Sequence, residues 1–144
     1  MIRLAGQDDL TPLLALYTHL HGNKMPQLIE AISPLWRDIL NDPNHFVIIA
    51  EEDGLAVSSC VLIVVPNLTH CQRPYALIEN VVTHEAYRKR GLASSVLTFA
   101  GDIARRRGCY KIMLMTGSKR ETTLRFYERA GYNRDDKTAF VQWL

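Results

Sequence analysis

The sequence predicts a mixed α/β (α+β) domain in which helices flank a mostly antiparallel central sheet. Short apolar runs rich in β-branched residues alternate with segments of helical periodicity, and a tight turn joins two of these runs. With 144 residues and 47% hydrophobic content, the chain suffices for one domain with a real core but not for two. The expected order is β-α-α-β-β-β-α-β-α-β, within a single domain over residues 1–144.

The first forty residues predict one strand followed by helices. Ile2 to Ala5 reads as a short strand, and Asp8 or Asp9 can cap the helix that follows. Apolar residues return at helical spacing over 26–40, where Pro34 should split or bend the segment.

The middle of the chain predicts three strands. The runs 45–50 and 55–65 are joined at Asp53-Gly54, which favours a hairpin. Residues 66–74 are polar and rich in turn formers, so we expect a loop before the next strand, Tyr75 to Thr83.

The last third predicts two helices and two more strand regions. Gly91 to Arg107 has one apolar helical face, and a buried-type strand follows over 110–115. The spacing of Ser118 and Glu121 is that of a capping box, which would open the last helix. A final strand or hairpin is expected over 132–144.

Composition excludes several classes of function. A formal net charge of +2 gives no overall field for nucleic acid or a membrane surface. Three scattered cysteines without a C-x-x-C pair indicate neither a disulfide framework nor a zinc knuckle, and the five histidines show no metal-ligand spacing. For this reason we expect no metal site. No signal peptide or membrane span is evident, so we expect a cytoplasmic protein.

The run from Tyr87 to Ala93 is the strongest functional pattern. A glycine at position 91 stands between a strand and a helix, where free N–H groups and the helix dipole can hold a phosphate. The basic residues before it, Arg88 to Arg90, add positive charge. Alone, the spacing R-x-x-G-x-A fits an ordinary basic turn equally well, while the absence of G-x-x-x-x-G-K-[ST] and G-x-G-x-x-G argues against an NTPase or dinucleotide loop.

In this context the sequence resembles the GNAT superfamily of acetyl-CoA-dependent N-acetyltransferases. The family pattern Q/R-x-x-G-x-G/A matches Arg88, Gly91 and Ala93, directly after a strand. The similarity continues through 109–112 and 124–132, and covers about half of the chain from Tyr75 onward. It implies acetyl-CoA as co-substrate, and the cofactor-binding positions it implies are Val81, Val82, Thr83, Arg88, Lys89, Arg90, Gly91, Leu92, Ala93, Ser94 and Tyr127.

Two catalytic roles follow from the chemistry and this resemblance. The acceptor amine must lose a proton before it attacks, and Glu79, an acid within an apolar strand, is the candidate base, acting through a water. The alternative is that Glu79 is a solvent-facing or ion-paired strand residue. Tyr127 matches the tyrosine of the family's F-Y-x-x-x-G-[FY] motif, which often protonates the leaving thiolate, and packing of the helix on the sheet is the alternative role. His84 is a reserve base.

The acceptor is less well defined than the cofactor. The segments around Glu79, Cys109 and Tyr127 resemble glucosamine-6-phosphate N-acetyltransferases, although Asn80 and Ala93 depart from their usual Asp and Gly. We expect a small-molecule amine, with peptide amines still open, and the family resemblance implies a homodimer. A non-catalytic acyl-CoA-binding module is the alternative, whereas a nucleic-acid-binding domain is disfavoured by the low charge.

Overall fold

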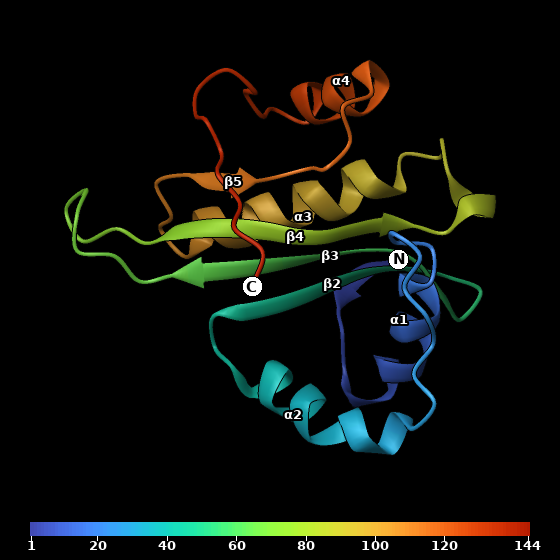
Figure 1. The fold of residues 1–144 in the computed structure, drawn as a ribbon. Helices are drawn as coiled ribbons and strands as arrows, with labels where there is room; N and C mark the ends of the chain where they lie inside the picture. The colour runs from blue at the N-terminus through green and yellow to red at the C-terminus, as the bar shows by residue number, and fades with distance from the viewer.

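The computed structural model describes all 144 residues and contains one five-stranded sheet of order β1-β2-β3-β4-β5 (Figure 1). Neighbouring strands are antiparallel except β4 and β5, which are parallel. This confirms the predicted mixed fold. The strands are β1 Ile2–Leu4, β2 His45–Glu52, β3 Leu55–Val65, β4 Tyr75–Thr83 and β5 Ile112–Leu114.

Helices cover both faces of the sheet. In Figure 1, α1 and α2 lie on one side and α3 on the other. The predicted break at Pro34 is confirmed, because a 3-10 turn ends just before it and a new helix carries the proline in its first turn. The helices are α1 Leu10–Tyr17, α2 Ser33–Asn41, α3 Leu92–Arg106 and α4 Glu121–Arg129, with 3-10 turns η1 Gln7–Asp9, η2 Ile29–Ile32 and η3 Glu85–Tyr87.

Each face of the sheet has its own hydrophobic core. Side chains alternate along β2, so that Ile48 and Ala50 pack toward α3 while Val47 and Ile49 pack toward α1 and α2. All four residues are at most 5% exposed. A strand with both faces buried reads as a continuous apolar run, which is why this segment shows no polar alternation.

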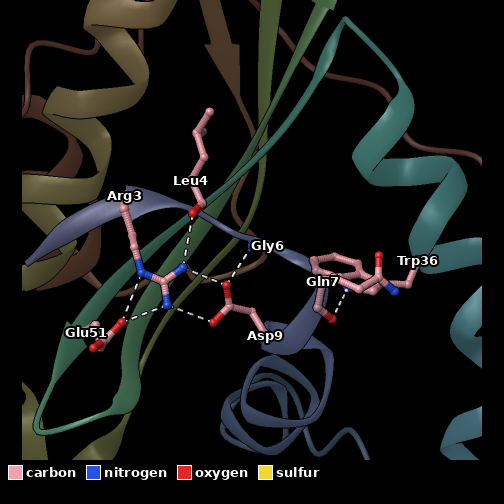
Figure 2. Close-up of polar contacts among 7 residues, drawn as sticks. All are labelled: Arg3, Leu4, Gly6, Gln7, Asp9, Trp36 and Glu51. Carbon is pink, nitrogen blue, oxygen red and sulfur yellow. Dashed lines mark hydrogen bonds and ion pairs between the residues drawn. The ribbon is translucent and has the colours of Figure 1, made fainter.

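A network around Arg3 joins β1, the 3-10 turn η1 just before α1, and β2 (Figure 2). The Arg3 guanidinium donates to Asp9 Oδ2 at 2.6 Å and Oδ1 at 2.9 Å, and to Glu51 Oε2 at 2.7 Å. Asp9 Oδ2 also accepts the Gly6 N–H at 2.6 Å. Because the Asp9 side chain is only 13% exposed, these bonds hold a largely buried carboxylate.

One side chain of α2 bonds to the 3-10 turn η1, next to the Arg3 network. Trp36 is 3% exposed, and its Nε1–H donates to the carbonyl of Gln7 at 3.1 Å, as Figure 2 shows. The indole thus contributes apolar area to the core while its N–H is satisfied. This tie fixes the start of α1 relative to α2.

Two predictions for the last third were wrong. Residues 132–144 form no strand and pair with no strand of the chain. The apolar side chains Phe140 and Trp143 in this segment are 91% and 92% exposed, so they are not buried against the sheet. The capping box also fails: α4 begins at Glu121, while the Ser118 hydroxyl accepts the Arg120 N–H at 3.3 Å and bonds the Thr123 hydroxyl at 3.2 Å. Strand β5 is shorter than expected, because β4 pairs with it over only three residues.

We predict that Asp9→Asn lowers the free energy of unfolding at neutral pH by about 2 kcal/mol, because Arg3 loses a charged, largely buried partner. Hydrogen bonding to Arg3 lowers the pKa of Asp9. The stabilisation is therefore complete above the unfolded-state pKa of about 3.9 and is lost as the pH falls through the lower folded-state value. Denaturant unfolding at pH about 7 and about 2 should show the difference between variant and wild type shrinking at the lower pH.

The matched control is Asp102→Asn, which breaks the exposed pair between Asp102 and Arg105, whose atoms lie 2.7 Å apart. Both of those side chains are at least half exposed, so a change below about 0.5 kcal/mol is expected. Equal losses in the two variants would contradict the structural role given to Asp9.

Candidate functional site

The central feature of the site is the point where β4 and β5 separate. The two strands pair only from Ala76 opposite Ile112 to Ile78 opposite Leu114. Strand β4 then continues from Glu79 to Thr83 with no strand on that side. Its edge there offers unpaired backbone groups, which an extended ligand could bind by main-chain hydrogen bonds.

A bulge in β4 lies at the same place. The register with β3 shifts between Ser59 and Val61, whose partners are Val82 and Glu79. Asn80 within the bulge has φ 52°, a left-handed conformation that Asn tolerates better than most residues. As a result Glu79 and Asn80 are exposed, although the strand around them is largely buried.

A cleft of about 1010 Å³ opens at this separation. Its walls come from β4, from the segment after α1 and from the connection between β5 and α4. The residues lining it are Ile78 to Thr83, His19 to His21, Arg88, Met115 to Arg120, Thr123 and Tyr127.

The structure brings most of the predicted site residues together in this cleft. Glu79, Tyr127 and Arg88 line it, together with Val81 to Thr83. Arg90 does not: its guanidinium lies 2.9 Å from the Glu52 carboxylate. Lys89 and the segment from Gly91 to Ser94 also lie outside the lining, next to Arg88 in the chain.

The turn at Gly91 has the geometry of an anion site. Gly91 is the N-cap of α3 with φ 79°, and no side chain caps the helix. A Cβ built there would meet nothing within 4 Å, so the space beside the backbone is open. The N–H groups of the first turn, on Leu92 to Ser94, are therefore free for a ligand, and the positive end of the helix dipole lies behind them.

Tyr127 lies on α4 and is half-buried among aromatic rings. Its ring centroid is 5.0 Å from that of Phe126 and 6.3 Å from that of Tyr132. Burial raises the pKa of the Tyr127 phenol above its usual value of 10.0. The hydroxyl therefore remains protonated at neutral pH and can donate a proton or a hydrogen bond into the cleft.

Several cleft residues were missed by sequence reasoning. His19 and His21 lie far from β4 in the chain and show no local pattern, and Lys119 and Arg120 looked like ordinary helix-start residues. Ser118 stands near the position where the family often has an asparagine, which was a usable signal. Thr123 also lines the cleft, whereas Thr122 does not.

His84, the reserve base, does not line the cleft. Its Nδ1 accepts the Ala86 N–H at 3.2 Å, and its ring centroid lies 4.2 Å from that of His19. The ring therefore holds the segment after α1 against the end of β4.

The structure contains neither a metal-binding cluster nor a membrane-spanning helix. No group of three or more His, Cys, Asp or Glu side chains could hold a metal ion. No helix has the length and apolar character needed to cross a membrane.

Comparison with known proteins agrees with this geometry. The model of the acetyltransferase (GNAT) family matches residues 11–132. A putative acetyltransferase from Agrobacterium tumefaciens is 36% identical, with a TM-score of 0.92 and 99% of each chain covered.

Two relatives carry names of N-acetyltransferases. Glucosamine 6-phosphate N-acetyltransferase of Trypanosoma brucei brucei is 33% identical over 84 residues, which are 58% of this chain and 55% of that protein. Aminoglycoside N(6')-acetyltransferase type 1 of Serratia marcescens is 26% identical over 99% of this chain and 97% of its own length. The chain belongs to the GNAT family of acetyltransferases.

Proposed function

We propose that this protein transfers the acetyl group of acetyl-CoA to a primary amine of a small molecule, by direct attack in a ternary complex. The observation that carries the proposal is the unpaired edge of β4, which lies in one cleft with Glu79 and Tyr127. The names of the two N-acetyltransferase relatives support an amine acceptor.

The residues present fit acetyl-CoA. The backbone of Val81 to Thr83 can hydrogen-bond an extended pantetheine arm, and the open turn at Gly91 can receive the pyrophosphate. Arg88, whose Nε donates to the Thr83 carbonyl at 3.3 Å, connects the two binding surfaces. When bound, the cofactor supplies an activated thioester.

Glu79 is the proposed base. The bulge exposes its carboxylate within the cleft, and no other carboxylate lines the walls. An ammonium group has a pKa near about 10.4, so the acceptor must lose a proton to attack at neutral pH. Glu79 accepts that proton, directly or through a water.

Tyr127 is the proposed acid. Its protonated phenol lines the cleft beside the β4 edge, and it can donate a proton to the departing sulfur. A thiol has a pKa near about 8.5, so protonation assists its departure.

A non-catalytic acyl-CoA-binding module is the second candidate, since the turn at Gly91 would serve it equally well. Glu79 and Tyr127 both line the cleft, which favours catalysis, because binding alone requires neither group.

We also infer a homodimer. The C-terminal segment from Phe140 to Leu144 exposes four large apolar side chains and pairs with no strand of its own chain. A second copy can cover this apolar segment. Sedimentation equilibrium of the full chain, compared with a chain ending at residue 139, decides between a dimer and a monomer.

The function is tested by following CoA thiol release from acetyl-CoA with a panel of amines, amino sugars and peptides. We expect Glu79→Gln to lower kcat/KM at neutral pH by about 100-fold, and the loss to shrink near pH 10, where the amine deprotonates without a base. Glu85→Gln is the matched control, because Glu85 is exposed and outside the cleft. Binding of acetyl-CoA without turnover of any amine would favour the non-catalytic module.

We predict that Tyr127→Phe lowers kcat by about 100-fold while changing the affinity for acetyl-CoA only a few-fold, because the substitution removes a proton donor and keeps the ring. The matched control is Tyr132→Phe, the same chemical change in a packed neighbour outside the cleft. Steady-state kinetics and calorimetry measure the two quantities. Equal kcat losses in both variants would show that packing, not proton donation, is responsible.

A further inference from the structure

The charges on the cleft walls are unbalanced. Three basic side chains line it, Arg88, Lys119 and Arg120, against a single carboxylate, Glu79. Two imidazoles, from His19 and His21, line the same cleft. A cleft with this lining attracts anions and repels multiply charged cations.

Lys119 and Arg120 are not neutralised by neighbouring acids. Neither side chain makes an ion pair or a hydrogen bond within the protein. Glu121, the next residue, is bound instead by Arg125 at 3.0 Å and Arg134 at 2.9 Å. Both cleft cations are therefore free to bind a ligand.

The cleft cations come from two different connections. Arg88 follows β4 and belongs with the turn at Gly91, where the cofactor's pyrophosphate is proposed to lie. Lys119 and Arg120 lie between β5 and α4, on a separate wall. A second anionic group, carried by the other substrate, would account for this second pair of cations.

We propose that the acceptor is an amine that also carries an anionic group, a phosphate or a carboxylate, which Lys119 and Arg120 bind. This inference rests on the proposed function, whose acceptor it specifies. Polycationic amines such as aminoglycosides are poor acceptors, because only Glu79 offers them a negative partner.

The test uses pairs of acceptors that differ only in the anion. Glucosamine 6-phosphate is compared with glucosamine, and an amino acid with its amide, so that the two pairs distinguish phosphate from carboxylate. We expect the anionic member of at least one pair to have a KM lower by about tenfold or more, as charge-assisted hydrogen bonds imply. The preference should decrease at high salt, because both cations are exposed. Sisomicin should be a poorer acceptor than glucosamine.

Variants connect this preference to the two cations. Lys119→Ala and Arg120→Ala should each reduce the preference for the anionic acceptor several-fold, through its KM. Arg129→Ala removes one exposed charge from α4 outside the cleft and should leave the ratio unchanged. If the two cleft variants weaken CoA binding instead, as measured by calorimetry, the cations serve the cofactor and the inference is wrong.

A binding measurement separates this inference from the proposed function. Calorimetry measures the affinity of CoA-saturated protein for glucosamine 6-phosphate and for glucosamine, and the same comparison is made with the amino acid and its amide. Turnover of amines without an anion preference in either pair overturns the inference and leaves the proposed function standing. A clear anion preference in binding, with no acetyl transfer to any amine, would keep Lys119 and Arg120 as an anion-binding pair but would overturn both the proposed function and the identification of the anionic amine as an acceptor.

Discussion

The separation of β4 from β5 is the constraint on which the rest of this structure depends. Hydrogen bonds between neighbouring strands stabilise a β-sheet, and here the pairing of β4 with β5 stops after Ile78 although β4 continues to Thr83. The bulge at Asn80 prevents a regular continuation and exposes Glu79. The backbone that the sheet leaves unpaired becomes the floor of the cleft.

The loops around this floor are connected by aromatic contacts. The His19 ring lies 4.2 Å from His84, which meets Tyr87 edge-on at 5.3 Å. The Arg90 guanidinium covers the other end of this row, 5.1 Å from the Tyr87 ring, and is anchored by Glu52. The row joins the segment after α1, which forms one wall of the cleft, to the turn before Gly91, so this wall and the proposed phosphate turn are held against each other.

Local patterns were enough to predict most of the fold. The hairpin at Asp53-Gly54 and the helix after Gly91 depend on neighbouring residues, and both formed as expected, with positive φ at each glycine. The prediction of a strand over residues 132–144 was wrong, because a strand also needs a partner strand, which no local sequence pattern supplies. Ser118 was assigned to a helix cap from spacing alone, whereas its hydroxyl bonds Thr123 within the cleft lining.

The candidate site was predicted only in part for the same reason. Gly91 and Tyr127 belong to patterns that carry their own context, so they could be placed before the structure was known. The contribution of His19 and Lys119 depends on how distant segments fold together across the sheet. The charge of the cleft, which bears on the acceptor, was therefore accessible only from the structure.

The central claim is that the turn at Gly91 and the free edge of β4 bind acetyl-CoA, and calorimetry on two glycine variants tests it most directly. Gly91 and Gly54 have similar positive φ, 79° and 77°, and each would place an added Cβ in open space. Gly91→Ala and Gly54→Ala should therefore cost similar stability, about 1 to 2 kcal/mol. We predict that only Gly91→Ala weakens acetyl-CoA binding, by about tenfold or more, because the added methyl group enters the space proposed for the pyrophosphate. Unchanged affinity in Gly91→Ala, or an equal loss in Gly54→Ala, would contradict the account.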